Sequence, residues 1–501
     1  MADADNNGTS LDVAALDLGS NSFHMLVARA TGGDLQVLDR MREPVRLAEG
    51  LDVDRRLSLP VQRRALACLE RFGQRLKGLP PAHVRVVGTN TLREMHRGQD
   101  FVAAAELALG HDIEIISGVE EARLVYGGVT HGMEEANRRL VVDIGGGSTE
   151  LIIGQGYRPR LMESVALGCV VHTQRFFETG AITRAAFGKA RLAARLELEF
   201  LQKTYRDAGW DLALGASGTI RGIWRVLMAQ GWAEQEITRE ALEKLIELTI
   251  KTGQIRKIKF EGLRDDRCPV FVGGLAVLAG IFDSLGIERM RTSDRALREG
   301  LIYDLLGRMN NRDVRDQSVQ SMAERYSVEA AHAADVADTA VSLLDQVAAP
   351  WGLDRQACTR LLRWAAELHE VGLAISHNGY HKHGEYILRH ADLPGFSQTD
   401  QRLLATLVRL HRGKFASSAL DQVPVAWLDP ARRMAVLLRC AYLVHRSRVP
   451  GLKPLIRAEG SRRALTLNFP EGWLDEHPLT AADLGREVEL RRNAGIRLKV
   501  L

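Results

Sequence analysis

A short pattern occurs twice in the first half of the chain and constrains its fold more than any other feature. Val13–Arg29 reads VAALDLGSNSFHMLVAR, and Leu140–Gly154 reads LVVDIGGGSTELIIG. When Asp17 is aligned with Asp143, both segments give an apolar strand, an aspartate, a turn of small residues that ends in serine, and a second apolar strand. The sequence therefore predicts two β-hairpins of the same design, 126 residues apart.

Strand-like and helix-like patterns alternate around these hairpins up to about residue 312, after which helical periodicity dominates. The alternation is typical of α/β layers with a largely parallel sheet. We therefore predict a domain boundary near residue 312, followed by an all-α domain over 313–448. The breaker Val449–Gly451 ends the helical part, and the short strand-like segments after it predict a small α+β module over 449–501.

The turns of the two hairpins have the composition of phosphate-binding loops. Glycines lack the Cβ that would keep an anion away from backbone N–H groups, and serine hydroxyls add donors. The candidate phosphate ligands are Ser20, Asn21, Ser22, Gly145, Gly146, Gly147 and Ser148. Either turn alone is as readily explained as an ordinary hairpin connection, but the two together favour a functional site.

An aspartate precedes each turn, and a further carboxylate follows the second turn. A phosphate anion would repel Asp17 and Asp143 in direct contact, so these side chains suit ligands of Mg²⁺ or of its bound waters. Glu150, on the second strand of its hairpin, can join them. The sequence thus predicts a magnesium site formed by these three residues.

Two strand-to-helix junctions repeat the small-residue composition. In Arg85–Arg93 (RVVGTNTLR) and Leu212–Ile220 (LALGASGTI) a strand ends at glycine and a helix begins, and the free N–H groups of its first turn can hold an anion. The candidate ligands are Thr89, Asn90, Arg93, Ser217, Gly218 and Thr219. Helix capping explains each junction about equally well. It does not explain why four such turns recur in one α/β region.

Two neighbouring acids, Glu120 and Glu121, begin a predicted helix after the strand-like segment Ile113–Ile116. The helix dipole stabilises carboxylates in a first turn, and this is the alternative to a catalytic role. Adjacent helical residues point about 100° apart, so at most one of the pair faces a cleft. A carboxylate there can orient or deprotonate a water that attacks phosphorus.

Six motifs together resemble those of the exopolyphosphatase/guanosine pentaphosphate phosphohydrolase family. They are DLGSNSFHM (Asp17–Met25), GTNTLRE (Gly88–Glu94), ISGVEEARLVYGGV (Ile116–Val129), DIGGGSTEL (Asp143–Leu151), GASGTI (Gly215–Ile220) and ALREGLIYDL (Ala296–Leu305). The resemblance implies an α/β fold of the duplicated actin/hexokinase-like (ribonuclease H-like) type, with subdomains over 1–130 and 131–312. It also implies that Glu121 is the base that activates water, and that Asp143 and Glu150 hold Mg²⁺.

Two activities compete within that family: removal of terminal phosphates from inorganic polyphosphate, and hydrolysis of guanosine pentaphosphate to the tetraphosphate. Two motifs of this chain resemble those of exopolyphosphatases. The chain has GTNTLRE where the pentaphosphate enzymes tend to have an Ala-Thr-Ala version, and DIGGGSTE where they tend toward Gly-Gly-Ala. We therefore expect an exopolyphosphatase, with guanosine pentaphosphate 5'-phosphohydrolase as the alternative. The presence of Glu121, Asp143 and Glu150 argues against a non-catalytic sensor, and a sugar-kinase-type phosphotransferase is a weaker enzyme alternative.

The helical region resembles the HD-type phosphohydrolase domain, which binds metal through a His-Asp pair and further histidines. The matching stretches are Leu368–Gly372 and Asn378–His383, and six of the 15 histidines fall between residues 369 and 411. Glu370 replaces the aspartate, so we expect a non-catalytic remnant that shapes a substrate channel, with a metal site as the alternative. The candidate channel residues are His381, Lys382, His383, Arg409, Arg412 and Lys414.

The net charge is +4, but residues 402–463 carry 13 Lys and Arg against 3 Asp and Glu. Such a segment can follow an extended polyanion through phosphate neutralisation. It has few aromatic residues and no recognisable nucleic-acid motif, so the expected partner is inorganic polyphosphate and not nucleic acid. Met1–Ser10 is no signal peptide, and the longest uncharged stretch, Cys268–Phe282, is shorter than the roughly 20 residues of a membrane span. We expect a cytoplasmic protein without an integral membrane segment, and the resemblance implies a homodimer.

Overall fold

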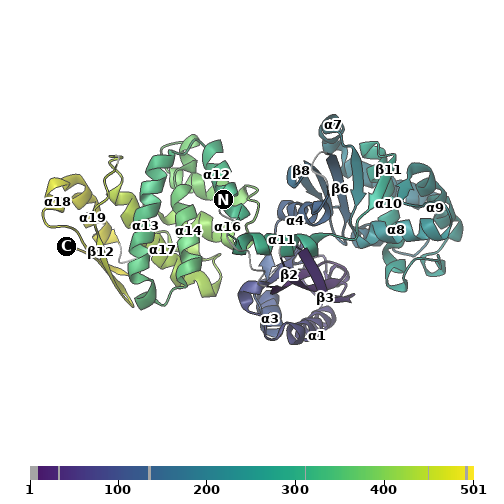
Figure 1. The fold of residues 1–501 in the computed structure, drawn as a ribbon, viewed down its shortest axis with the longest axis horizontal. Helices are drawn as coiled ribbons and strands as arrows, with labels where there is room; N and C mark the ends of the chain where they lie inside the picture. The colour runs from purple at the N-terminus through teal and green to yellow at the C-terminus, as the bar shows by residue number, and fades with distance from the viewer. Residues whose placement is uncertain are drawn as a thin grey trace, which may run out of the picture. The chain divides into compact units, whose positions relative to one another are not determined.

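The computed structural model describes residues 10–31, 34–96, 98–133, 137–310, 312–449, 451–490 and 495–501. The chain divides into two compact units, Met1–Arg312 and Asp313–Leu501. Two sheets with helices on their faces make up the first unit, and a helical bundle with a small sheet makes up the second (Figure 1).

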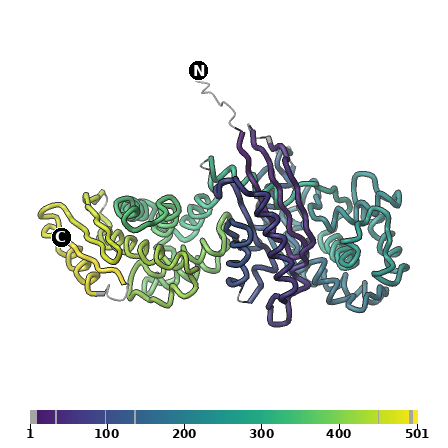
Figure 2. The backbone as a smooth tube through the Cα atoms, turned by 90° about the horizontal axis from the view of Figure 1, so that it is seen from below, coloured from purple at the N-terminus to yellow at the C-terminus, as the bar shows by residue number. Residues whose placement is uncertain are grey.

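The first lobe of the first unit is built on a five-stranded sheet in the order β3-β2-β1-β4-β5. Its N-terminal strands, in purple, run side by side in Figure 2. Its strands are β1 (Leu11–Leu18), β2 (Phe23–Thr31), β3 (Asp34–Glu43), β4 (Val84–Gly88) and β5 (Glu114–Ile115). Its helices are α1 (Leu59–Leu76), α2 (Asn90–Glu94), α3 (Gly98–Leu109) and α4 (Gly118–Thr130). Apolar residues alternate along β1, so that Ala14 and Leu16 pack with α1 and α3 while Val13 and Ala15 pack with α4.

The second lobe repeats this plan around a six-stranded sheet in the order β10-β11-β9-β6-β7-β8. Its strands are β6 (Arg138–Ile144), β7 (Thr149–Gln155), β8 (Arg158–Val165), β9 (Leu212–Gly215), β10 (Glu236–Thr238) and β11 (Arg289–Thr292). Its helices are α5 (Cys169–Phe177), α6 (Arg184–Glu197), α7 (Glu199–Ala208), α8 (Gly218–Ala229), α9 (Arg239–Thr252), α10 (Cys268–Leu285) and α11 (Leu297–Met309). The order β8-β7-β6-β9-β11 corresponds to β3-β2-β1-β4-β5 in the first lobe.

The two predicted hairpins are confirmed, and they are equivalent residue by residue. Asp17 is the next-to-last residue of β1 and lies opposite His24, whereas Asp143 is the next-to-last residue of β6 and lies opposite Glu150. In both hairpins the next residues of the chain form a four-residue turn between the paired strands. The repeat therefore places an aspartate at the same edge of each sheet, with a histidine beside one and a glutamate beside the other.

The last helix of the first unit, α11, does not belong only to the second lobe, within whose predicted range of 131–312 it falls. Leu301 and Ile302 share a buried core with Ala122 and Val125 of α4, and the same core reaches β1. The apolar side of α11 is complementary to α4, so the chain returns to the first lobe before the unit ends. A single cut after residue 130 therefore does not separate the two lobes.

We predict that Gly128→Ala destabilises this contact between α4 and α11. A Cβ at Gly128 would come within 2.1 Å of the carbonyl oxygen of Ala296 and 2.7 Å of the backbone nitrogen of Gly300. Overpacking of this kind costs about 1–3 kcal/mol, so the thermal unfolding midpoint of the first unit should fall. Gly127→Ala is the matched control, because a Cβ at Gly127 meets nothing within 4 Å. Equal midpoints for the two variants would contradict the prediction.

Helix α10 is apolar enough, together with the turn before it, to pass a test for membrane spans. The segment Asp265–Leu285 has a mean hydropathy of 1.8, but 83% of it is buried inside the fold. Val272, Leu275 and Ile281 of α10 belong to the core of the second lobe. The apolar character of α10 is thus explained by its place in that core.

The second unit is a helical bundle joined to a three-stranded sheet. Its helices are α12 (Val314–Arg325), α13 (Ala330–Trp351), α14 (Arg355–Glu367), α15 (Tyr380–His390), α16 (Gln398–Leu410), α17 (Val425–Val444), α18 (Trp473–Glu476) and α19 (Pro478–Leu490), and its strands are β12 (Arg457–Ser461), β13 (Ala464–Asn468) and β14 (Arg497–Val500). Leu465 and Leu467 of β13 share one core with α13 and α17, and Trp351 Nε1 donates to the carbonyl oxygen of Ser461 at 2.8 Å. The predicted module over 449–501 therefore has no separate core from the bundle, because its sheet is too small to bury its own apolar face.

Candidate functional site

A cleft of about 320 Å³ lies in the first unit, where the ends of the two hairpins meet. Eleven of the predicted residues line it: Asp17, Ser20, Asn21, Ser22, Thr89, Glu121, Asp143, Gly145, Glu150, Ser217 and Gly218. They come from both lobes and from both strand-to-helix junctions. Small-residue turns that are distant in the sequence therefore converge on one place.

The two hairpin turns approach each other so closely that glycine is required between them. A Cβ at Gly146 would lie 2.9 Å from Cβ of Ser20, and a Cβ at Gly147 would lie 2.1 Å from Oδ1 of Asn90. Any larger residue would therefore force the lobes apart. These contacts explain why Gly146 and Gly147 are glycines, and they bring the phosphate-loop candidates of both lobes together.

Four carboxylates gather in the cleft, and burial dominates their protonation. Burial raises the pKa of Asp17 and of Glu150 to about 7 and the pKa of Asp143 to about 6. It raises the pKa of Glu121 well above its usual value, and the nearby Glu150 carboxylate adds to this effect. Carboxylate oxygens are the ligands that Mg²⁺ prefers, and a buried group of them favours a bound cation or protons. The residues present therefore fit the predicted magnesium site, with Asp143 and Glu150 side by side on paired strands.

The neighbouring acids at the start of α4 have different environments, as expected for adjacent helical residues. The hydroxyl of Ser117 caps the helix by accepting from the backbone N–H of Glu120 at 3.1 Å. The Glu120 carboxylate turns away from the cleft and accepts a hydrogen bond from Arg123 Nε at 2.7 Å. Glu121 lines the cleft, and its Oε2 accepts no hydrogen bond from any described residue, although Arg93 Nη1 lies 3.5 Å away.

Six predicted phosphate ligands do not line the cleft: Asn90, Arg93, Gly146, Gly147, Ser148 and Thr219. The polar side chains of two of them, Arg93 and Thr219, bond within the wall. Arg93 donates to the carbonyl oxygen of Ile116 at 2.9 Å, and the hydroxyl of Thr219 donates to the carbonyl oxygen of Ile144 at 3.0 Å. These residues therefore support the loops from behind in this structure.

Sequence reasoning did not single out the cations of the cleft. Seven arginines line it: Arg40, Arg42, Arg221, Arg225, Arg264, Arg267 and Arg298. Nε of Arg42 and Nε of Arg221 are buried without a hydrogen-bond partner among the described residues. Unpaired buried N–H donors beside a cleft suit an anionic ligand. Only the presence of Arg298 within the motif ALREGLIYDL gave a signal in the sequence.

His24 occupies the first-lobe position that corresponds to Glu150 in the second lobe, and an arginine from α11 contacts it. Arg298 is buried, and its Nη1 lies 3.4 Å from Nδ1 of His24. Burial and then the charge of Arg298 lower the pKa of His24 well below its usual value, so His24 is neutral and can accept the hydrogen bond. The first lobe thus presents a neutral imidazole, with a guanidinium beside it, where the second lobe presents Glu150.

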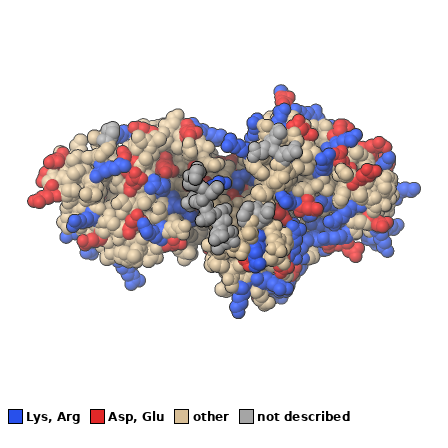
Figure 3. All heavy atoms as spheres, in the orientation of Figure 1, with Lys and Arg blue, Asp and Glu red and all other residues tan. Residues whose placement is uncertain are grey.

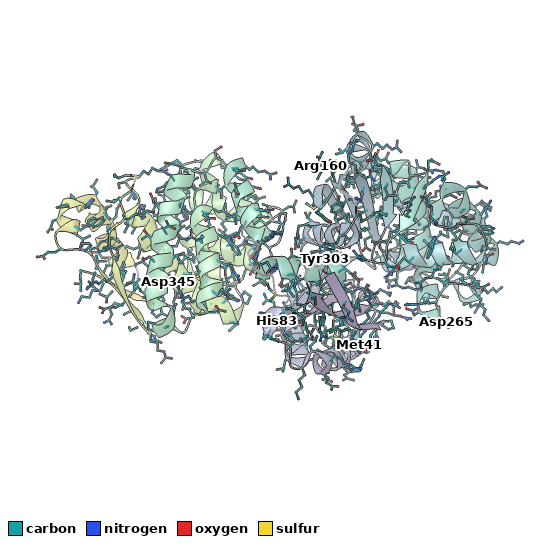
Figure 4. The ribbon with its side chains drawn as sticks, viewed as in Figure 1. Met41, His83, Arg160, Asp265, Tyr303 and Asp345 are labelled. Carbon is teal, nitrogen blue, oxygen red and sulfur yellow. The ribbon has the colours of Figure 1, made fainter. Side chains whose placement is uncertain are left out.

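Positive charge continues from the cleft onto the surface of the first unit. On the face shown in Figure 3, Lys and Arg atoms gather in the region where β3 and α8 lie in Figure 1. Arg42 of β3 pairs with Asp266 at 2.6 Å, and Figure 4 labels their chain neighbours Met41 and Asp265, which lie on the same side of the unit. The ion pair joins the edge of the first sheet to the segment before α10.

In the second unit, part of the basic segment 402–463 is paired with carboxylates. Arg439 is buried and bonded to Glu487 at 2.7 Å, and Arg446 bonds to Asp483 at 2.6 Å. Carboxylates from outside the segment thus neutralise part of its charge, and the expectation that the segment follows a polyanion stays a prediction.

The predicted channel residues lie partly together. Burial, together with the charges of Arg409, Arg412 and Lys382, lowers the pKa of His381 to about 4. Arg412 lies over the ring of Tyr380, with 4.4 Å from Cζ to the ring centroid. A cationic group is thus present around His381.

We predict that Mg²⁺ stabilises the protein more at pH 8 than at pH 5. Asp17, Asp143 and Glu150 titrate at about 6 to 7 in the fold but near 4 in an unfolded chain. Between about pH 4 and 7 the folded state binds more protons, so the stability of the metal-free protein falls as the pH rises. Mg²⁺ takes the place of these protons. Unfolding midpoints with and without Mg²⁺ at both pH values measure the effect, and equal shifts would contradict it.

Comparison with known proteins places these features in a family. A model described as "Ppx/GppA phosphatase family" matches residues 26–309, and one described as "Ppx/GppA phosphatase, domain III" matches residues 314–488. A protein of Aeromonas hydrophila named guanosine-5'-triphosphate,3'-diphosphate pyrophosphatase is 41% identical over 488 residues, which cover 97% of this chain and 98% of its own length. The protein of that name from Vibrio cholerae is 38% identical and covers 97% of both chains.

Solved structures agree on the fold. An exopolyphosphatase from Cytophaga hutchinsonii has a TM-score of 0.54 at 21% identity, covering 59% of this chain and 98% of its own. The Ppx-GppA enzyme of Aquifex aeolicus has a TM-score of 0.50 at 24% identity, covering 59% of this chain and 99% of its own. The predicted class, a duplicated actin-like α/β half followed by a helical domain, is confirmed.

Proposed function

The chain belongs to the Ppx/GppA phosphatase family, and from this premise we propose that it hydrolyses guanosine pentaphosphate to guanosine tetraphosphate and orthophosphate. The bond to be cleaved is the terminal phosphoanhydride of the 5'-triphosphate. The relatives at 38–41% identity, which cover nearly the whole chain, are named for this substrate and support the choice.

The observation that carries the chemistry is the position of Glu121. Its carboxylate lies in the same cleft as Asp143 and Glu150, with a raised pKa and an oxygen free of hydrogen bonds from described residues. A base works best when its pKa is near the working pH. Glu121 accepts a proton from water, the water oxygen bonds to the terminal phosphorus, and the bond from phosphorus to the bridging oxygen breaks in line with it.

The arginines and turns bind the charge that this reaction concentrates. Guanidinium groups that line the cleft, such as those of Arg298 and Arg267, offer donors to the oxygens of the transferred phosphoryl group, whose charge spreads in the transition state. The residues that would hold Mg²⁺ are Asp143 and Glu150, with Asp17 from the other lobe. When bound there, the ion neutralises phosphate charge.

Inorganic polyphosphate is the second candidate substrate, favoured by the exopolyphosphatase-like letters of GTNTLRE and DIGGGSTE. These turns face the phosphate groups that both substrates share. They are therefore poor discriminators, because a nucleoside and a longer phosphate chain differ only beyond the terminal phosphates. For this reason the names of the relatives weigh more than the two motifs.

A direct comparison of substrates tests the proposal. Orthophosphate release from guanosine pentaphosphate and from long-chain polyphosphate is measured at equal enzyme, with and without Mg²⁺. We expect a higher kcat/KM for guanosine pentaphosphate and a requirement for Mg²⁺ with both. A preference for polyphosphate would overturn the proposed substrate, and no release from either would overturn the hydrolase chemistry.

A further inference from the structure

The second unit holds a buried group of two imidazoles and a carboxylate, far in sequence from the residues of the cleft. His332 lies on α13, and His369 and Glu370 follow α14. Their ligand atoms all lie within 4.8 Å of one another, and Oε1 of Glu370 is 3.9 Å from Nε2 of each histidine. All three side chains are at most 5% exposed. Polar groups buried in this way need partners.

The ring of His369 is oriented as in a metal ligand. Its Nδ1 lies 2.6 Å from the carbonyl oxygen of Ala366, which can only accept a hydrogen bond. Nδ1 therefore carries the proton, and Nε2 presents a lone pair to the cluster. Nε2 is buried and has no hydrogen-bond partner among the described residues. Histidines that bind metals use this arrangement, in which a backbone carbonyl fixes the ring.

A protein cation already contacts the carboxylate of this cluster. An Nη of Arg448 bonds to Oε1 of Glu370, and the other Nη pairs with Glu329 at 2.5 Å. Arg448 holds a left-handed backbone conformation with φ 54°, which is uncommon for a residue with a side chain. The guanidinium is 41% exposed, so it can leave the carboxylate for solvent without being buried elsewhere.

We propose that His332, His369 and Glu370 form a site for a divalent transition metal of the Zn²⁺ class, for which Arg448 competes. Imidazole ligands favour such metals over Mg²⁺. Zinc bonds of about 2.0–2.2 Å place tetrahedral ligands roughly 3.4 Å apart. The two distances of 3.9 Å from the carboxylate must therefore shorten by about half an ångström, and the ligand nitrogens of the two histidines, which lie within 4.8 Å of each other, must also move together. A metal ion and the Arg448 guanidinium are both positive, so they repel each other when both contact the Glu370 carboxylate. Binding of the metal therefore displaces Arg448.

To test the proposal, the tag-free, full-length protein is titrated with Co²⁺. Saturating Mg²⁺ is present throughout, so that sites made only of oxygen ligands are already filled. The readout is the visible absorption of Co²⁺ bound to imidazole, followed by its loss when Zn²⁺ is added. We expect one Co²⁺ per chain, and Arg448→Gln should tighten binding roughly tenfold because it removes the competing charge. Glu370→Gln and His369→Gln should weaken binding roughly 10- to 100-fold or more. His390→Gln, an exposed histidine of the same unit, is the matched control.

Each outcome decides the proposal. The site is supported if Arg448→Gln binds Co²⁺ and the double variant Arg448→Gln/Glu370→Gln does not. This comparison holds even if the wild type binds Co²⁺ too weakly to detect, or if His369→Gln does not fold. Absence of the imidazole spectrum in both the wild type and Arg448→Gln overturns the site. If the wild type and Arg448→Gln bind Co²⁺ with equal affinity, Arg448 does not compete with the metal for Glu370. If Glu370→Gln still binds Co²⁺ like the wild type, the metal binds elsewhere.

Discussion

Replacing Glu121 with glutamine is expected to lower kcat about 10²- to 10⁴-fold, the range that a general base contributes. The amide has nearly the same shape as the carboxylate but cannot take a proton from water at neutral pH. It also removes one negative charge from a cleft that holds three other carboxylates, so phosphate binding should not weaken. Single-turnover phosphate release, together with binding measured by calorimetry, separates the two effects.

Glu120→Gln is the matched control, one position away on the same helix. The Glu120 carboxylate bonds to Arg123, and its Oε1 lies 3.7 Å from Nη2 of Arg85. This variant should lower the unfolding midpoint and leave kcat within a few-fold of the wild type. If Glu121→Gln released phosphate like the wild type, or if the Glu120 variant lost activity while remaining folded, the assignment of the base to Glu121 would be wrong.

The hairpins and their carboxylates could be predicted because every signal lies within one short segment. The apolar strands, the aspartate and the turn around Asp17 follow one another directly, and the same is true around Asp143. Strand pairing then fixes Glu150 beside Asp143, since register in a hairpin follows from its turn. The choice between Glu120 and Glu121 followed from helical geometry together with the resemblance to the family.

The arginines of the cleft could not be predicted because no local pattern joins them. Arg42, Arg221, Arg267 and Arg298 come from four segments that meet only after the sheets and α11 have packed. Alone, each resembles an ordinary surface cation. Only the fold shows that they line one cleft, and that Nε of Arg42 and Nε of Arg221 are buried there without a hydrogen-bond partner among the described residues.

The basic segment 402–463 shows the converse limit of sequence reasoning. Its excess of positive charge is a property of the segment, whereas pairing depends on the whole fold. Lys453 bonds to Asp335 and Asp338 at 3.2 Å, and Arg439 bonds to Glu487. Carboxylates distant in sequence thus remove part of the charge that suggests a path for a polyanion.

Asp143→Asn is expected to lower kcat/KM about 10³-fold, equivalent to roughly 4 kcal/mol of transition-state stabilisation, and to abolish the stabilisation by Mg²⁺. The reason is the asymmetry of the repeat: Asp143 lies opposite Glu150, whereas Asp17 lies opposite the neutral His24, next to Arg298. The two carboxylates of the second lobe should therefore contribute most to binding the cation.

Ser164→Ala and Asp17→Asn make this expectation quantitative. The hydroxyl of Ser164 donates to Glu150 Oε1 at 2.8 Å and orients it, so its loss should weaken Mg²⁺ binding roughly 10- to 100-fold. Asp17→Asn should weaken Mg²⁺ binding less than Asp143→Asn, because the strand partner of Asp17 is the neutral His24 and not a second carboxylate. Mg²⁺ titrations of activity and of the unfolding midpoint rank the three variants. If Asp17→Asn had the largest effect on Mg²⁺ binding, the ion would belong to the first lobe, and the asymmetry between His24 and Glu150 would not determine where it binds.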